Sequence, residues 1–225
     1  MRITIIYDNE VYEGQLTAKW GFSCLVEYNG HNLLFDTGGD GSILIENMKK
    51  LNIDYKQIDT IFISHGHWDH SGGLAEILRL NEKAILYIPP TVLQLDIKIP
   101  PTFIKLAERE NLIVVNEAKE LYPGIYSTGE QKNIEQSLVI KTEKGLVIIA
   151  GCAHQGINKI LEEASKIGDI YALIGGFHDF NKYELLKEIE LICPTHCTEN
   201  KSEIFNRYPN KCIKGGAGRV IDICS

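Results

Sequence analysis

The chain has 225 residues, of which 44% are hydrophobic and 24% are charged, and its formal net charge is −7. This length fits one layered α/β domain, and the composition is that of a globular protein. The negative charge disfavours a general binder of nucleic acid or anionic membranes, because there is no basic surplus to attract phosphates. Local basic side chains can still hold one small anionic substrate.

The N-terminus begins as a strand and lacks the basic segment and long apolar stretch of a signal peptide, and no apolar run is long enough to cross a bilayer. The six cysteines are scattered through strand-like segments, which is typical of reduced, buried thiols rather than of a disulfide framework. We therefore expect a cytoplasmic protein without a membrane partner.

The first half of the chain has the pattern of a hairpin followed by β/α units. We predict strands at 2–7, 21–28, 31–36, 58–64 and 84–88, and helices that end near residue 50 and span about 71–80. Asn29-Gly30 separates the second and third strands and is a strong signal for a tight hairpin turn. The segment 91–110 contains Pro100-Pro101, is the least regular part, and is expected to form a lid or a pocket wall.

The second half repeats this order. We predict strands at 112–116, 124–127, 137–142, 145–150, 169–174, 191–195 and 219–224, and helices at 156–167, 181–189 and 199–206. No linker, low-complexity tract or block of charge divides the chain, so residues 1–225 are predicted to form a single domain. The repeated order indicates two packed sheets with helices outside, a four-layer αβ/βα sandwich of the α/β class.

Potential metal ligands are concentrated at residues 65–70 (His-Gly-His-Trp-Asp-His), directly after an apolar strand. Imidazole suits zinc, iron, manganese or nickel, and a carboxylate adds a harder ligand. Gly66 lets the backbone turn so that the first two histidines reach one ion, while Asp69 and His70 project toward a neighbouring position. Catalytic groups in layered α/β folds gather at the carboxyl ends of strands, so the cluster predicts a two-metal site.

The 65–70 cluster resembles the signature of the metallo-β-lactamase superfamily. Residues 33–38 (Leu-Leu-Phe-Asp-Thr-Gly) are similar to the first motif of that superfamily, and residues 194–198 (Pro-Thr-His-Cys-Thr) resemble its last histidine motif. The resemblance covers essentially the whole chain and implies the metallo-β-lactamase fold. It also implies that His196 binds the second ion and that Asp36 anchors the metal loop, although Asp36 taken alone can equally cap the following helix.

The middle of the chain departs from the superfamily pattern, which supplies a third histidine to the first ion and then an aspartate that bridges both ions. In one alignment His154 is the third histidine. In the other, Glu135 takes that place and Cys152 stands where the aspartate is normal, with His154 arriving two residues later. Both alignments bring His154 to the metals, whereas Glu135 and Cys152 remain alternative metal or pocket residues, and Cys152 can equally be a small buried residue. Without an acidic bridge, two ions are expected to differ in affinity.

His178 follows another apolar strand and is either a helix-capping or surface histidine, or a general acid that faces the substrate. Six of the seven histidines lie at strand ends, which favours one shared cavity. The segments around Asn9, Glu135, Cys152, His178 and His196 together resemble the metal-dependent hydrolase branch (β-lactamase superfamily II) related to 7,8-dihydropterin-6-methyl-4-(β-D-ribofuranosyl)-aminobenzene-5′-phosphate synthase. With that resemblance we assign Asn9 and His178 to substrate binding.

These patterns predict a metal-dependent hydrolase or transferase that acts on a phosphate or pyrophosphate ester of a small anionic molecule, with dihydropterin pyrophosphate condensation as the specific variant. One or two divalent ions are expected, zinc first and manganese, iron or magnesium as alternatives. A lactonase or thioester hydrolase of the same fold, and a metal-binding module without turnover, are the competing hypotheses. The predicted catalytic groups are Asp69 and His178, and the predicted metal ligands are His65, His67, Asp69, His70, His154 and His196.

Overall fold

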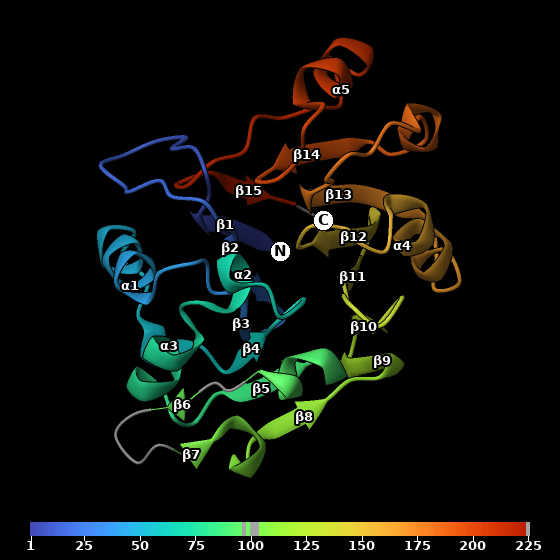
Figure 1. The fold of residues 1–225 in the computed structure, drawn as a ribbon. Coiled ribbons are helices and arrows are strands. Elements are labelled where there is room, and N and C mark those ends of the chain that lie inside the picture. The colour runs from blue at the N-terminus through green and yellow to red at the C-terminus, as the bar shows by residue number, and fades with distance from the viewer. Residues whose placement is uncertain (96–97, 100–103, 224–225) are drawn as a thin grey trace.

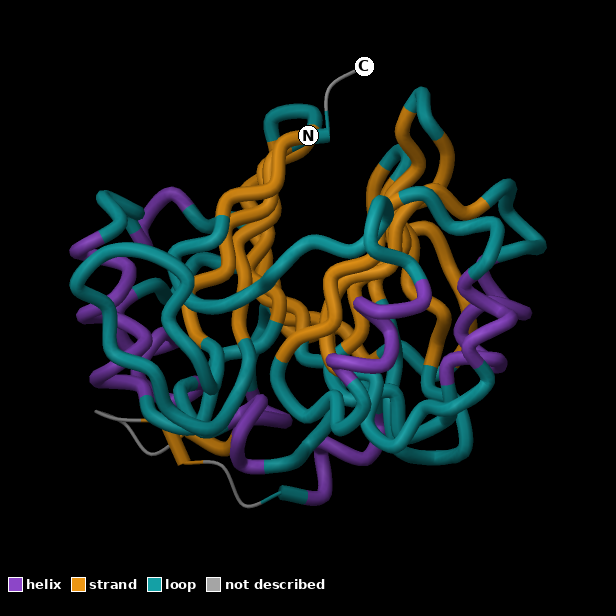
Figure 2. Tube along the Cα trace, turned by 90° about the horizontal axis from the view of Figure 1, so that it is seen from above, coloured by secondary structure: helices purple, strands orange, loops and turns teal. Residues whose placement is uncertain are grey.

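Two β-sheets face each other, and helices cover their outer faces (Figure 2). The computed structural model describes residues 1–95, 98–99 and 104–223. The predicted αβ/βα sandwich is confirmed, with helices, sheet, sheet and helices as successive layers (Figure 1). None of the helices within the described ranges is long and apolar enough to cross a membrane.

The first sheet joins the start of the chain to its end. Its strand order is β15-β1-β2-β3-β4-β5-β8, antiparallel from β15 to β3 and parallel from β3 to β8. Because β3 and β4 are parallel, the segments that follow them leave the sheet at the same edge. The strands are β1 (Arg2–Tyr7), β2 (Ser23–Tyr28), β3 (His31–Phe35), β4 (Thr60–Phe62), β5 (Ile85–Ile88), β8 (Leu112–Val114) and β15 (Val220–Asp222).

The second sheet has the order β14-β13-β12-β11-β10-β9, and its last three strands in sequence are parallel. Their carboxyl ends therefore meet at one edge. The strands are β9 (Glu117–Tyr122), β10 (Ile125–Gly129), β11 (Leu138–Thr142), β12 (Gly145–Ala150), β13 (Ile170–Gly176) and β14 (Leu191–Thr195), and a separate pair is formed by β6 (Lys98–Ile99) and β7 (Ile104–Lys105).

Three apolar clusters hold the layers together. Phe35 and Phe62 of the first sheet share a buried cluster with Ile149 of the second, so the sheets pack face to face. Leu44 of α1 and Ile160 of α4 are fully buried in the clusters on the two outer faces. Each such side chain contributes roughly 1.5–3 kcal/mol by its burial. The helices are α1 (Gly41–Lys50), α2 (Trp68–Ser71), α3 (Leu74–Leu80), α4 (Ile157–Ala164) and α5 (Lys201–Arg207), with short 3₁₀ helices η1 (Tyr55–Gln57), η2 (Pro90–Gln94), η3 (Leu106–Glu108) and η4 (Tyr183–Leu186).

The helix predicted at about 71–80 is instead two helices, α2 and α3. Gly72 and Gly73 separate them and lie against the loop that follows β3. A Cβ atom on Gly73 would stand 2.4 Å from the Thr37 carbonyl oxygen, and one on Gly72 would stand 2.5 Å from that of Gly39. The break therefore lets the histidine turn pack against the first motif.

The structure differs from the predicted secondary structure at two further places. Strand β9 was missed because its sequence, Glu-Ala-Lys-Glu-Leu-Tyr, is polar, which suits its place at the edge of the second sheet. The helix predicted at 181–189 is only the 3₁₀ helix η4, because the Glu190 amide already bonds the Tyr171 carbonyl and starts β14. Within 91–110 the structure has η2, η3 and the β6–β7 pair, and the rest of the predicted lid lies outside the described residues.

Candidate metal centre

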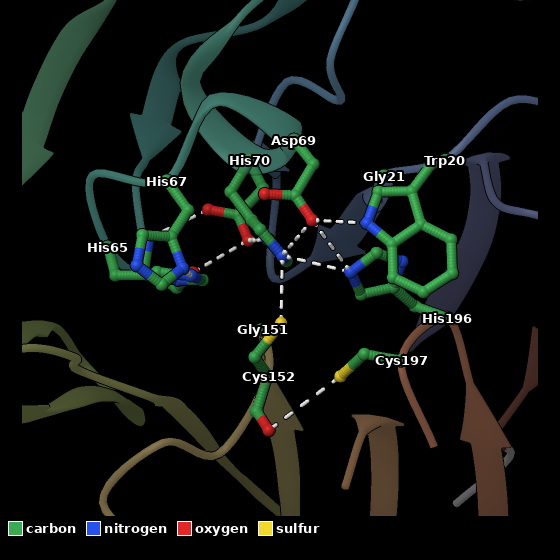
Figure 3. Close-up of polar contacts among 12 residues, drawn as sticks. Trp20, Gly21, His65, His67, Asp69, His70, Gly151, Cys152, His196 and Cys197 are labelled. Atoms are coloured by element: carbon green, nitrogen blue, oxygen red, sulfur yellow. Dashed lines mark hydrogen bonds and ion pairs between the residues drawn. The ribbon is translucent and has the colours of Figure 1, made fainter. Parts of the chain in front are cut away.

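The predicted ligands come together where the carboxyl ends of parallel strands from the two sheets meet (Figure 3). The turn after β4 supplies residues 65–70 from the first sheet. The second sheet supplies Cys152 and His154 after β12, and His196 after β14. Residues more than 120 positions apart in the chain are thus in direct contact, as His70 and His196 are.

The first group of donors consists of His65, His67 and His154. His67 Nδ1 lies 3.1 Å from His65 Nε2 and 3.1 Å from His154 Nε2. The Ser64 hydroxyl donates to Asp36 Oδ2, so it accepts from His65 Nδ1 at 2.9 Å. In the neutral His65 ring this leaves the Nε2 lone pair directed at the other two rings. Lone pairs that converge in this way need a shared cation or proton between them, so this group fits a metal ion.

The second group consists of Asp69, His70 and His196. His196 Nε2 lies 3.2 Å from His70 Nε2 and 3.3 Å from Asp69 Oδ2. The opposite nitrogen of each ring is already paired, since His70 Nδ1 lies 2.7 Å from Asp36 Oδ2 and His196 Nδ1 lies 3.0 Å from Asn9 Oδ1. In the neutral rings both Nε2 atoms therefore present lone pairs beside a carboxylate oxygen, which is again the donor set of a cation site.

Asp36 holds the first-sheet side of this centre. The residue is fully buried and its backbone has a positive φ of 53°. Oδ1 accepts from the Ser64 amide at 2.7 Å, and Oδ2 accepts from the Ser64 hydroxyl and pairs with His70. The alternative role as a helix cap is wrong, because Asp40 caps α1 by accepting from the Ser42 amide.

Glu135 does not face the metal positions as a ligand would. Its fully buried carboxylate accepts four backbone N–H groups, those of Gly151, Cys152 and Ala153 on Oε1 at 3.0–3.1 Å and that of His154 on Oε2 at 2.9 Å. The alignment that put Glu135 in a histidine position is therefore wrong about its role. The carboxylate fixes the 151–154 loop, and that loop carries His154.

Cys152 lies at the middle of the centre. The residue is 3% exposed, and its Sγ lies 3.1 Å from His70 Nε2. The neighbouring Cys197 thiol points to the Cys152 carbonyl oxygen at 3.8 Å (Figure 3). Contact with the Cys197 thiol and burial together raise the pKa of the Cys152 thiol, so without a cation it carries its proton at neutral pH.

Asn9, which we assigned to substrate binding, instead orients His196. Its Oδ1 pairs with the His196 ring and accepts from the Gly21 amide at 3.0 Å, and its Nδ2 donates to the His196 carbonyl at 3.0 Å. Both ends of the amide are thus occupied by the protein. Asp8 supports the same residue by accepting the His196 amide at 3.1 Å, and burial raises the pKa of Asp8 to about 6.

Trp20 is a residue of the site that the sequence analysis missed. Its Nε1 donates to Asp69 Oδ2 at 2.9 Å, and its ring centroid lies 5.1 Å from that of His196. The ring is nevertheless 51% exposed, so it forms part of the rim. A lone tryptophan in a polar connection carries no sequence signal for this role.

His178 lies beside the first group rather than within it. Its ring centroid is 5.1 Å from that of His154, and its side chain is 42% exposed. The residue has a positive φ of 47°, and its carbonyl accepts the Glu199 amide. His178 is therefore placed to reach a molecule bound over His154.

The protonation states of His154, His196 and Asp69 suit a divalent cation. Burial lowers the pKa of His154 and of His196 to about 4, so both rings are neutral at pH 7. Burial alone would raise the pKa of Asp69, but the contacts with His196 and His70 lower it by more. The net pKa is therefore lowered, and the carboxyl is ionised at neutral pH. Neutral imidazoles and an ionised carboxylate are the forms that bind metal.

Comparison with known proteins agrees with this geometry. The family description of the metallo-β-lactamase superfamily matches residues 21–96. Over the full length of both chains, the fold superposes with a TM-score of 0.79 and 26% identity on a metal-dependent hydrolase of the β-lactamase superfamily. The chain therefore has the metallo-β-lactamase fold, which implies binding of a divalent metal, and it is an enzyme.

Two curated relatives refine the class. The chain is 29% identical to 7,8-dihydropterin-6-methyl-4-(β-D-ribofuranosyl)-aminobenzene-5′-phosphate synthase from Methanocaldococcus jannaschii, over 97% of this chain and 95% of that one. It is 28% identical to a UPF0173 metal-dependent hydrolase from Saccharolobus solfataricus, over 73% and 78% of the two chains. This homology supports a phosphate-related, metal-dependent function.

Proposed function

We propose that this enzyme transfers or hydrolyses a phosphate or pyrophosphate ester of a small anionic molecule at a two-ion centre, with zinc as the preferred metal. The observation that carries the proposal is the pair of donor groups in which imidazole nitrogens from the two sheets lie 3.1–3.2 Å apart. Ions bound there would stabilise negative charge that develops on phosphoryl oxygens and lower the pKa of water to about 7.

The residues of the chain have separate roles in this chemistry. Asp69 Oδ2 is ionised, held by the Trp20 N–H and directed at His196, so it can orient the attacking group by accepting its proton. His178 is exposed enough to donate a proton from its ring to the leaving oxygen of a substrate bound over His154. Asp36, Asn9 and Glu135 hold the donors in place.

The specific reaction that we propose is condensation of a pterin pyrophosphate with an aminobenzene ribofuranosyl phosphate. Its support is the name of the synthase from M. jannaschii, which the chain matches over nearly its whole length. The described cysteines are all free, which is consistent with our proposal that the enzyme works in a reducing cytoplasm.

The test is an assay of the zinc-loaded chain with a pterin pyrophosphate plus the aminobenzene partner, and separately with a generic phosphodiester. We expect turnover of at least one, with release of pyrophosphate in the first case. His67→Ala and His154→Ala should each lose activity together with bound metal. No turnover of either substrate at full metal occupancy would reject the proposal, and faster cleavage of lactones or thioesters would favour a different hydrolase. Unchanged metal content in both variants would reject the ligand assignment.

A further inference from the structure

One side chain is shared by the two donor groups, and it is not the carboxylate that the superfamily pattern supplies. The Cys152 Sγ lies within 4.8 Å of donor atoms of His65 and His154, which belong to the first group. It also lies within 4.8 Å of donor atoms of His70 and His196, which belong to the second group. The thiol is thus the donor common to both positions.

The position of this sulfur is fixed by the backbone. The Cys152 amide is bound by the buried Glu135 carboxylate, as are the amides on either side of it. Gly151 has no room for a side chain, since a Cβ atom there would stand 2.3 Å from the Ser64 hydroxyl. The next residue, Cys152, places its sulfur toward the first-sheet ligands.

The surroundings of the sulfur are those of a ligand rather than of a packing thiol. Cys152 faces imidazole nitrogens, with His70 Nε2 at 3.1 Å, and it is 3% exposed. Cys193, by contrast, is fully buried in the apolar cluster between the sheets. A thiol that only filled space would be expected among such apolar neighbours.

We propose that Cys152 binds both metal ions as a bridging thiolate, in the place where other members of the superfamily use an aspartate. This inference rests on the two-ion centre of the proposed function. On binding, the S–H bond breaks, its proton leaves to solvent, and the sulfur forms one bond to each ion. We had expected two ions to differ in affinity because no acidic residue bridges them. With the sulfur as the bridge, the reason for that difference no longer applies.

A thiolate bridge also sets the metal preference. Thiolate is a soft ligand that selects zinc, cobalt(II) and cadmium over magnesium and manganese, which prefer oxygen. The centre should therefore load with zinc in the presence of excess magnesium. Retention of magnesium instead of zinc would contradict the inference.

The first test uses cobalt(II) added to the metal-free, full-length chain. Cobalt bound to thiolate gives a charge-transfer absorption in the near ultraviolet, which imidazole and carboxylate ligands do not give. We expect this absorption in the native chain, its loss in Cys152→Ser, and its persistence in the control Cys212→Ser, whose thiol lies outside both donor groups and donates to the Ile204 carbonyl. Persistence in Cys152→Ser, or absence from a native chain that has bound cobalt, would overturn the inference.

The second test distinguishes a bridge from a ligand to one ion. In the chain loaded with two equivalents of cadmium-113, a bridging thiolate shifts both cadmium resonances toward the range of sulfur ligands, whereas a terminal thiolate shifts only one. One shifted resonance would reject the bridge. Cys152→Asp, which offers a carboxylate in place of the thiolate, should still bind two ions, but neither cadmium resonance should lie in the range of sulfur ligands. Far-ultraviolet circular dichroism checks that each variant is folded.

These outcomes separate the inference from the proposed function. Binding of metal with no sulfur signature would remove the bridge but leave the two-ion phosphoesterase intact. If the native chain binds no metal at all, both proposals are rejected. If Cys152→Ser fails to fold, Cys152→Asp decides, because retention of a sulfur signature in that variant would show that another thiol is the ligand.

Discussion

The two sheets hold their shares of the metal centre in different ways. On the first sheet, one turn of six residues carries four donors, and side chains fix it through Asp36, Ser64 and His70. On the second sheet, the donors follow two strands, β12 and β14, and the 151–154 loop is fixed by four backbone amides that donate to Glu135. The second sheet also places Ala153, His178 and His196 at positive φ. A metal ligand can thus be positioned by hydrogen bonds to its side chain, as His70 is, or by hydrogen bonds that fix the backbone of its loop, as for His154.

The largest expected effect comes from removing the anchor of the second sheet. Glu135→Ala leaves four buried N–H groups without their acceptor, so we expect the free energy of unfolding to fall by about 4 kcal/mol. Urea unfolding of the metal-free chain measures it. Glu143→Ala, at an exposed position in the β11–β12 turn, is the matched control and should change stability by less than about 0.5 kcal/mol. A loss below about 1 kcal/mol in Glu135→Ala would show that the carboxylate does not hold the loop.

The corresponding change on the first sheet should lower the affinity for metal more than it lowers the free energy of unfolding. Asp36→Asn keeps the shape of the side chain but cannot accept from both Ser64 and His70 as a carboxylate does. We expect a roughly 10–100-fold loss of zinc affinity, as for other partners that orient metal ligands. Competition with a chromophoric chelator measures the affinity. If zinc binds Asp36→Asn as tightly as the native chain, the orienting role of Asp36 is refuted.

Asn9→Ala tests the contact that orients the His196 ring. The ring loses its Nδ1 partner and can rotate or take the other tautomer, so the expected loss of zinc affinity is about tenfold. Asn9→Asp, which keeps the acceptor, should recover most of it. If the variant instead raises the KM for substrate and leaves zinc affinity unchanged, the original assignment of Asn9 to substrate binding is correct.

The smallest effect is expected at the rim. Trp20→Phe removes the N–H donor to Asp69 but keeps an aromatic ring next to His196. One hydrogen bond to a partly exposed carboxylate is worth about 1 kcal/mol, so kcat should fall by about fivefold while metal content stays constant. Equal kcat values for Trp20→Phe and the native enzyme would show that Asp69 needs no such support.

The contrast between the sheets also explains what the sequence could reveal. The 65–70 turn was recognisable because its donors are adjacent in the chain, and Asn29-Gly30 predicted a hairpin that its φ values of 49° and 82° confirm. The roles of Asn9 and Trp20 depend on contacts with residues 187 and 49 positions away, which no local pattern encodes. Glu135 binds backbone amides, and every residue type except proline offers those, so its partners leave no trace in the sequence.

The placement of donors on both sheets has a consequence for the chain as a whole. Neither half can assemble the centre alone, since His65, His67 and His70 come from one sheet and His154 and His196 from the other. If the protein were cut between β8 and β9 and the two fragments mixed, a bound cation would hold ligands from both fragments and so stabilise their complex. Reassembly of the fragments would then depend on free metal in solution, as ligand linkage requires.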